Sequence, residues 1–420
     1  MNKLYTLSIG IILVFIAACA KNDIAIAPPV QQNTEVLLQG WNTWNNPSVL
    51  SHVKMPEGLN IQLMLKKRKG RPCWLDDARI SNPNMIFEEK IIPGKHAWDG
   101  SFTELELEWE GQRAVIKTAT CEDDFYLLYE PLESKDVNSL QNFQTPYFLV
   151  VRTGILWNKN GKLTKNGDEI FADFGETSYK ISSTESDENL ALPLNSPYLS
   201  FYCDKKVAIY TGTKKTLEEI EILIARKEKE FDTSIQKYGP LKDAYQSMQS
   251  VMAWNLFYEA ENQRAIVSVS RTWNQNWGGY IIFGWDTYFA ALMAAMDYKE
   301  LAYSNAISIT NAITDEGFVP NLEASNGIKS FDRSQPPVGS MICKLIYEKY
   351  SEKWFLEEVY QNLLTWNRWW EKERNNNGFL SWGSNPHPKG MNGHSIQGAK
   401  WESGLDNSPL FDDVVFNPED

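Results

Sequence analysis

The spacing of apolar residues changes once along this chain of 420 residues, near Thr216. From about Glu35 onward, short runs such as 101–120 alternate apolar and polar residues, and this period of two is typical of β-strands. Beyond Pro240 the apolar residues recur every three to four positions, as they do in helices. The sequence therefore predicts two parts, a β-sandwich over 35–215 and an all-helical region over 241–420.

The segment between these parts, 216–240, is predicted to be a helical linker. Thr216 is followed three residues later by Glu219, a pair typical of the capping box that begins a helix. A turn is predicted at Glu110–Gly111 between two strands of the sandwich. Further helices are predicted within 241–261, 285–314, 336–351 and 352–375.

The N-terminus has the pattern of a bacterial lipoprotein signal peptide over residues 1–19. Lys3 precedes a short apolar run, and the small residues Ala17 and Ala18 come directly before Cys19. We expect Cys19 to be lipidated, with 20–34 a polar tether, so that the protein is anchored in the bacterial cell envelope and faces the periplasm or the outside. The alternative is plain secretion with Cys19 removed.

Composition narrows the class of partner. The formal charge of −13 argues against nucleic acid, because phosphates need a basic surface. Aromatic residues make up 13% of the chain, which indicates either large cores or sugar binding. The cysteines after the signal peptide are widely spaced, which disfavours a zinc site, and free buried thiols are expected. These cysteines are Cys73, Cys121, Cys203 and Cys343.

Two loop segments next to predicted helices carry charged side chains among aromatic residues. Asp286 follows Trp285 at the start of an apolar helix, where an aspartate stabilises the first turn. Asp286 can therefore be a helix cap, a residue that contacts a ligand, or both. Arg333 and Gln335 precede Pro336–Pro337, which mark the next helix start. A rigid turn there would project Arg333, whose fixed fork of donors suits sugar hydroxyl groups.

A third segment near residue 400 holds two carboxylates, Glu402 and Asp406, framed by Trp401 and Asn407. Either both carboxylates are solvated on a loop, or they belong to the wall of a polar pocket. In the second case we expect Asp406 to be buried beside Trp401.

The three segments read GWDTYF, RSQPPVGS and AKWESGLDNSP. In this order and at these separations they resemble glycoside hydrolase family 63, which includes processing α-glucosidase I and mannosylglycerate hydrolases, and they are similar to the family 37 trehalases. The resemblance covers roughly 241–420 and implies an N-terminal β-sandwich followed by an (α/α)6 barrel. The predicted helices amount to about the first half of such a barrel, so a truncated or split gene product, or an incomplete gene model, is expected.

The resemblance implies an inverting exo-α-glycosidase of the α-glucosidase or α-mannosidase type, which hydrolyses oligosaccharides or small glycosides by acid/base catalysis. Asp406 matches the general acid, and the general base is a glutamate expected beyond residue 420, so this chain alone is expected to hydrolyse poorly. Asp286 and Arg333 match residues that hold the sugar ring. The further residues assigned to substrate binding or to support of the pocket are Trp285, Gln335, Trp401, Glu402 and Asn407.

No organic cofactor and no catalytic metal are implied. A structural Ca²⁺ occurs in some members of the family, but the sequence contains no calcium-loop pattern. The expected partners are an oligosaccharide or small glycoside and, through the lipid, a membrane. The alternative function is a catalytically inactive carbohydrate-binding or vestigial lipoprotein from a truncated gene. An in-frame continuation of the DNA after codon 420 would favour the enzyme.

Overall fold

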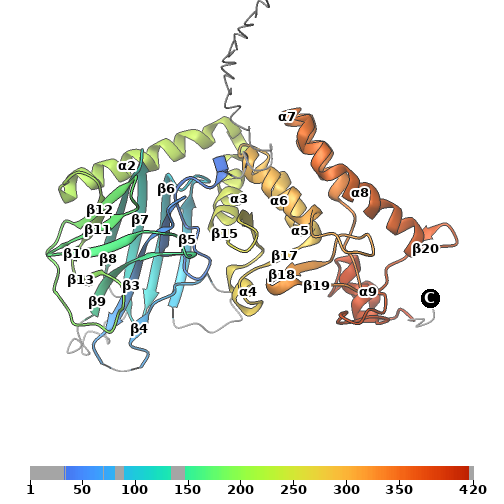
Figure 1. Ribbon diagram of the computed structural model, residues 1–420, viewed down its shortest axis with the longest axis horizontal. Coiled ribbons are helices and arrows are strands. Elements are labelled where there is room, and N and C mark those ends of the chain that lie inside the picture. Colours follow the sequence, from blue (N-terminus) through green and yellow to red (C-terminus); the bar gives the residue numbers. More distant parts are fainter. Residues whose placement is uncertain (1–32, 34, 70, 81–88, 134–146, 416–420) are drawn as a thin grey trace, which may run out of the picture.

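A computed structural model of the protein describes residues 33, 35–69, 71–80, 89–133 and 147–415 (Figure 1). The predicted lipidation site Cys19 and almost all of the predicted tether lie outside these residues. Among the helices that the structure describes, none combines the length and the apolar character needed to cross a membrane.

The N-terminal part is mostly β-sheet, as predicted, and forms two antiparallel sheets. The first sheet has the order β1-β2-β3-β9-β13, with β4 beside β3, and the second has the order β10-β11-β12-β14-β8-β7-β6-β5. The strands of the first sheet are β1 (Gly40–Asn42), β2 (Ser51–Met55), β3 (Leu59–Lys67), β4 (Trp74–Leu75), β9 (Tyr147–Ile155) and β13 (Tyr198–Tyr202). Those of the second are β5 (Glu89–His96), β6 (Phe102–Trp109), β7 (Gln112–Cys121), β8 (Asp124–Leu132), β10 (Lys162–Asn166), β11 (Glu169–Asp173), β12 (Ser178–Ser183) and β14 (Val207–Thr211).

The two sheets pack face to face through one shared apolar core. Ile61 of β3, Leu105 of β6 and Leu127 of β8 belong to the same buried cluster. Along β6 and β7, buried residues alternate with more exposed ones, because successive side chains of a strand point to opposite faces. The predicted turn is confirmed: Glu110 and Gly111 join β6 to β7 with φ of 50° and 81°.

Helix α2 (Leu217–Ser234) lies across the outer face of the second sheet (Figure 1). Its predicted capping box is confirmed, with the Thr216 hydroxyl accepting from the backbone N–H of Glu219. Ile220, Ile224 and Phe231 are buried against the sheet. The predicted linker therefore also covers the sandwich, because its apolar face closes a second core.

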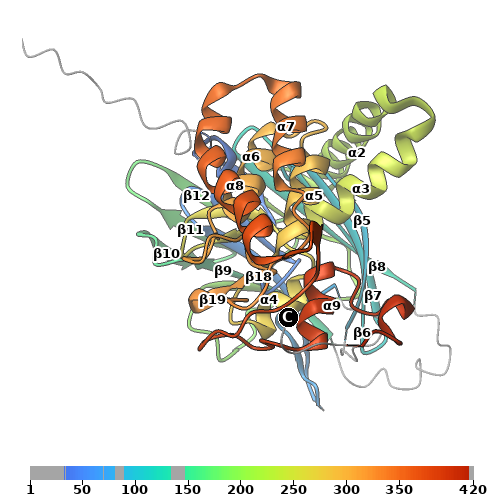
Figure 2. The same ribbon diagram turned by 90° about the vertical axis from the view of Figure 1, so that its right-hand side faces the viewer.

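The helical part follows, as the spacing of apolar residues predicts. Its helices are η2 (Ile235–Leu241), α3 (Lys242–Trp254), α4 (Arg271–Asn276), α5 (Gly284–Ala294), α6 (Lys299–Thr310), η3 (Ser325–Gly327), α7 (Gly339–Tyr350), α8 (Lys353–Glu373), α9 (Ile396–Ser403) and η4 (Pro409–Phe411). Short strands lie between them: β15 (Leu256–Glu259), β16 (Arg264–Val267), β17 (Ile281–Phe283), β18 (Leu322–Ala324), β19 (Ile328–Lys329), β20 (Asn375–Asn376) and β21 (Phe379–Leu380). Helices α5 to α8 surround one large core (Figure 2).

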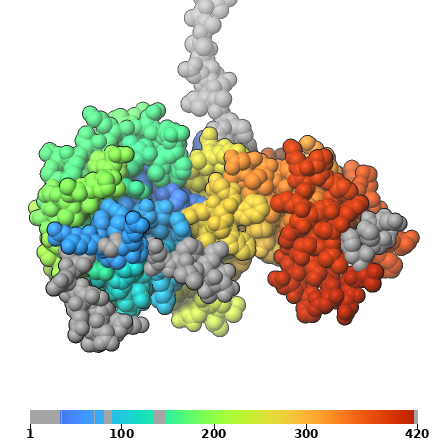
Figure 3. Space-filling view, turned by 90° about the horizontal axis from the view of Figure 1, so that it is seen from below, coloured from blue at the N-terminus to red at the C-terminus, as the bar shows by residue number. Residues whose placement is uncertain are grey.

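One predicted helix is shorter than expected. The helix predicted over 241–261 ends at Trp254, because the chain leaves the helix at Asn255 and enters the hairpin β15–β16. Apolar residues continue from α3 into β15, so the spacing of apolar residues does not mark where the helix ends and the strand begins. In Figure 3 the C-terminal segment occupies the end of the molecule opposite the sandwich, with the residues around α3 to α5 between them.

A buried arginine joins the sandwich to the helical part. Arg271, at the start of α4, is 3% exposed, and within the described residues it donates hydrogen bonds to oxygen atoms of uncharged groups alone. Nη2 lies 2.6 Å from the Thr43 carbonyl oxygen of the sandwich, and Nε lies 2.7 Å from the Trp254 carbonyl oxygen of α3. Burial lowers the pKa of Arg271 to about 9. The contacts fix α4, which carries Trp273 and is followed directly by Trp277, two residues of the site described next.

Candidate functional site

A cavity of about 730 Å³ opens where α4, the first turn of α5, the segment 332–335 and the end of α9 meet. Five aromatic rings line it: Trp273, Trp277, Phe283, Trp285 and Trp401. Its other lining residues are Val269, Asp286, Asn321, Leu322, Arg333, Gln335, Met391, Asn392, Gly404, Leu405, Asp406, Asn407 and Ser408. The three sequence segments singled out above thus meet at one place, although more than a hundred residues separate the first from the last.

Asp286 lies in the first turn of α5, and Gln335 holds the start of this helix. The Gln335 Oε1 atom accepts a hydrogen bond of 2.9 Å from the backbone N–H of Trp285. Gly284 permits this approach, because a Cβ atom there would lie 3.0 Å from the Gln335 Oε1 atom. Gln335 therefore satisfies a helix donor that has no partner inside the helix, and the half-buried Asp286 lines the cavity.

Arg333 is 2% exposed, and three groups hold its guanidinium. Nη1 lies 2.8 Å from Oδ1 of Asp332, Nε lies 3.2 Å from Oδ1 of Asn321, and the guanidinium carbon lies 4.5 Å from the centre of the Trp401 ring. Burial lowers the pKa of Arg333, while Asp332 and Glu402 oppose this change, and an arginine stays charged at neutral pH. Nη2 makes no hydrogen bond within the described residues, which leaves it available to a ligand in the cavity.

Sequence reasoning missed Asp332, although it stands directly before Arg333. Its side chain is fully buried, and Oδ2 accepts a hydrogen bond of 2.6 Å from the backbone N–H of Asn392. Its carbonyl oxygen accepts another of 2.6 Å from the N–H of Asn385. Asp332 thus positions both Arg333 and the loop whose Met391 and Asn392 line the cavity.

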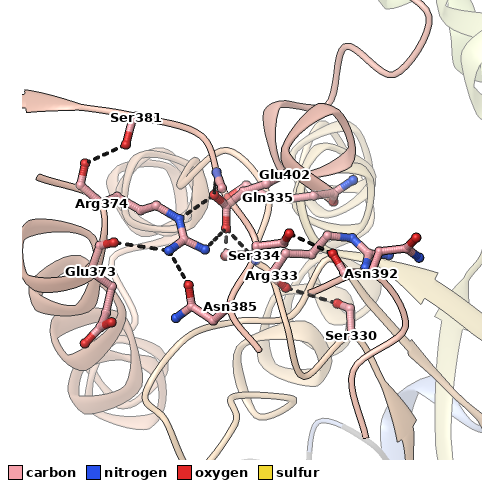
Figure 4. Close-up of polar contacts among 12 residues, drawn as sticks. Ser330, Arg333, Ser334, Gln335, Glu373, Arg374, Ser381, Asn385, Asn392 and Glu402 are labelled. Atoms are coloured by element: carbon pink, nitrogen blue, oxygen red, sulfur yellow. Dashed lines mark hydrogen bonds and ion pairs between the residues drawn. The ribbon is translucent and has the colours of Figure 1, made fainter. Parts of the chain in front are cut away.

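Glu402 lies behind the cavity wall rather than on it. Its carboxylate is fully buried and forms a bidentate ion pair with Arg374, with N–O distances of 2.6 and 2.9 Å (Figure 4). It also accepts hydrogen bonds from the backbone N–H groups of Ser334, at 3.0 Å, and Gly383, at 2.7 Å. The alternative of a solvated loop carboxylate is wrong for Glu402, and its predicted role in the pocket becomes one of support. Sequence reasoning missed its partner Arg374.

Asp406 is exposed, so the expected burial beside Trp401 is wrong. The reason is local: α9 ends at Ser403, and Gly404 takes a left-handed conformation with φ of 71°, which turns the chain outward. Asp406 and Asn407 still line the cavity. The pKa of Asp286 is raised, chiefly by burial and further by the negative charge of Asp406. The negative charge of Asp406 therefore acts on Asp286 across the cavity that both residues line.

Replacing Gly404 by alanine is expected to destabilise the protein by about 1–3 kcal/mol and to move Trp285. A Cβ atom there would lie 2.6 Å from Cζ2 of the Trp285 ring, and the positive φ adds strain. Chemical denaturation and tryptophan fluorescence measure both effects. Gly327→Ala is a matched control, because Gly327 has the same φ of 71° with nothing within 4 Å of its Cβ position. An equal loss in both variants would contradict the contact with Trp285.

The cysteines that the structure describes do not line this cavity. Cys203 and Cys343 are buried, whereas Cys73 and Cys121 are half-buried, and all four are free thiols. Within the part of the chain that the structure describes, no group of three or more His, Cys, Asp or Glu side chains is placed to hold a metal ion.

Residues 280–417 match the family model of the mannosylglycerate hydrolase MGH1-like glycoside hydrolase domain. The matched segment includes every residue that lines the cavity except Val269, Trp273 and Trp277. The match supports a hydrolase of the family 63 type by resemblance, and it implies a carbohydrate substrate. A search of curated proteins found no match.

Proposed function

We propose that this protein is an inverting exo-α-glycosidase of the α-glucosidase or α-mannosidase type, which acts on oligosaccharides or small glycosides. The observation that supports it best is the meeting of Asp286, Arg333 and Asp406 in one cavity lined by aromatic rings. The faces of a pyranose ring carry C–H groups that pack on flat rings, while its hydroxyl groups need charged or polar partners. The cavity offers both kinds of contact.

In this proposal Asp286 and Arg333 hold the terminal sugar. The ionised Asp286 accepts hydrogen bonds from hydroxyl groups, and Arg333 donates through Nη2. Asp406 donates a proton to the glycosidic oxygen as the bond breaks, while a second carboxylate activates water on the opposite face of the ring. We assign this base to a glutamate outside the described residues. We also propose that helices α3 to α8 are part of an (α/α)6 barrel.

The function is tested by incubating the purified protein with α-glucosides and α-mannosides and following the released sugar by proton NMR. We expect the anomer first released to be inverted relative to the substrate. Removing general-acid assistance with Asp406→Asn should lower the rate by about 10²–10⁴-fold. Hydrolysis that persists in this variant would contradict the role of Asp406. We expect residues 1–420 alone to hydrolyse slowly, because the proposed base lies outside the described residues. Sugar binding without hydrolysis by a chain that also carries the base would favour the catalytically inactive binding protein.

The contribution of Arg333 gives a separate prediction. We expect Arg333→Ala to weaken binding of a glycoside by about 10–150-fold, because hydrogen bonds to charged groups contribute roughly 1.5–3 kcal/mol. Isothermal titration measures the change. Lys353→Ala serves as the control, since Lys353 is exposed on α8 and does not line the cavity. Unchanged affinity in Arg333→Ala would show that the sugar lies elsewhere.

We further infer that Cys19 carries a lipid that anchors the protein in the cell envelope. The support is the signal-peptide pattern and the small residues before Cys19. Mass spectrometry of the mature protein is expected to show a lipidated cysteine at its N-terminus. An unmodified N-terminus at another residue would contradict the anchor.

A further inference from the structure

We infer that Asn274 is a positioning residue which, together with Asn46 of the sandwich, holds one wall of the cavity in place. Trp273, Trp277 and Phe283 form this aromatic wall. The effect of the wall on glycoside binding rests on the proposed function, whereas its placement does not. The inference gives the β-sandwich a part in the sugar site.

The aromatic wall stands on a short helix. Helix α4 has six residues, and Trp277 directly follows the last of them. A helix of this length is not stable by itself in water, because the first turn is costly to form. Trp273 is 38% exposed, and its ring packs edge-on against Phe283 with the ring centres 5.8 Å apart. The position of both tryptophans therefore depends on contacts between α4 and other parts of the chain.

Asn274 makes such contacts from a place between the two tryptophans in the sequence. It is fully buried and does not itself line the cavity. Its Nδ2 atom donates hydrogen bonds of 2.9 Å to Oδ1 of Asn46 and to Oγ of Ser268. Its Oδ1 atom accepts a hydrogen bond of 3.0 Å from the backbone N–H of Ile281. Asn46 in turn donates to the carbonyl oxygen of Gly279, at 2.7 Å.

These hydrogen bonds join the sandwich to two elements of the aromatic wall. Asn46 lies in the loop between β1 and β2, and Ile281 begins β17, the strand that carries Phe283. Both N–H groups and the oxygen of the Asn274 amide have partners, so a flipped amide would lose all of them. Because a buried polar group without a partner is costly, Asn274 fixes the direction in which α4 meets β17.

Arg271 attaches the other end of α4 to the same loop. As the first residue of the helix, it donates to the carbonyl oxygens of Thr43 and Asn45. A helix that is attached at one end can still swing about that end. Attachment of its last turn through Asn274 and Asn46 removes this freedom, and the two tryptophans lie in and next to that part of the helix.

Asn46→Ala is therefore expected to loosen the aromatic wall and to weaken glycoside binding by about 3–10-fold, the equivalent of one hydrogen bond. The variant removes the oxygen that accepts from Asn274 and the donor to the Gly279 carbonyl group. The apparent affinity then falls in proportion to the fraction of molecules that keep the wall in place. Asn46 does not line the cavity, so the substitution takes away no contact with the sugar.

Asn45→Ala is the matched control. Asn45 is the neighbouring residue in the same loop and is half-buried like Asn46. Its side chain donates a hydrogen bond of 2.8 Å to Ser51, within the sandwich. Both variants thus remove one amide from the loop, but Asn46→Ala also frees α4. Asn274→Ala removes the other partner of the same bond and should loosen the wall further, since three hydrogen bonds are lost.

Fluorine NMR of the protein labelled with 5-fluorotryptophan observes the aromatic wall without any sugar. The signals of Trp273 and Trp277 are assigned with the variants Trp273→Phe and Trp277→Phe. We expect both signals to shift or broaden in Asn46→Ala and to stay unchanged in Asn45→Ala. Urea denaturation checks that the two alanine variants are similarly stable, and isothermal titration with methyl α-glucoside and methyl α-mannoside then compares their affinities.

The outcomes separate this inference from the function on which its second half rests. Unchanged signals of Trp273 and Trp277 in Asn46→Ala, or an equal change in Asn45→Ala, would overturn the inference and leave the glycosidase proposal standing. A change in the signals without a loss of affinity would overturn the claim that the wall serves sugar binding. If neither glycoside binds the wild type while the signals respond as expected, the proposed function fails, and the placement of the wall by Asn46 is supported.

Discussion

Replacing Arg374 by alanine is expected to lower the free energy of unfolding by about 3–5 kcal/mol, the usual cost of breaking a buried ion pair. The substitution leaves the Glu402 carboxylate fully buried without its charged partner. The backbone N–H groups of Ser334 and Gly383 that now donate to Glu402 cannot compensate for a whole charge. The Ser334 N–H group connects the segment next to Arg333 to Glu402 of α9. Loss of the ion pair should therefore disturb Arg333, and glycoside binding should weaken as well. Urea denaturation measures the stability.

A matched control separates burial from charge. Lys353→Ala breaks an exposed pair with Glu357, whose side chains are 81% and 61% exposed, and should cost less than about 0.5 kcal/mol. The double variant Arg374→Met, Glu402→Leu removes both charges and should recover part of the stability lost in Arg374→Ala. A loss in Arg374→Ala no larger than in the control would contradict the supporting role of this pair.

Acidification is expected to destabilise the sandwich through two buried histidines. Burial is the main cause that lowers the pKa of His52 and of His96 from 6.5 to about 3, and the charge of Arg271 adds to it. Since the folded pKa lies below the unfolded value, the unfolded chain takes up protons first as the pH falls below 6.5. Stability is therefore full above this pH and is lost progressively toward pH 3. At pH 5 the loss amounts to about 2 kcal/mol for each histidine.

Thermal unfolding measured between pH 7.5 and pH 5 gives the slope of stability against pH. His52→Leu should reduce it, and the cost to packing should be small, because Nδ1 of His52 is buried without a hydrogen-bond partner. His394→Asn serves as the control: His394 is exposed, and its φ of 48° suits asparagine. A slope unchanged in His52→Leu would show that other groups govern the acid response.

Local patterns in the sequence predicted the order of the elements well. The switch from a period of two to a helical period near Thr216 separates the two parts, and the capping box at Thr216 and Glu219 begins α2 as expected. The resemblance also pointed to three segments that the structure brings to one cavity. Such features depend on neighbouring residues or on short motifs, which a single sequence displays directly.

Features that depend on distant partners were not predictable. Arg374 and Glu402 are 28 residues apart and meet only because α8 and α9 pack behind the same wall. No period in the sequence marks such a pair. The exposure of Asp406 depends on the left-handed turn at Gly404, whose contact with Trp285 comes from a helix more than a hundred residues earlier. Composition and the spacing of residues contain no information about the Arg374–Glu402 pair or the Gly404–Trp285 contact.

A crystal structure of the Asp406→Asn variant with a neutral α-linked disaccharide tests the central claim most directly. The variant keeps the shape of the site while removing the proposed proton donor. We expect one pyranose ring within hydrogen-bond distance of the Asp286 carboxylate and of Nη2 of Arg333, with the glycosidic oxygen facing residue 406. A sugar bound at another surface, or a ring in this cavity that touches neither Asp286 nor Arg333, would contradict it.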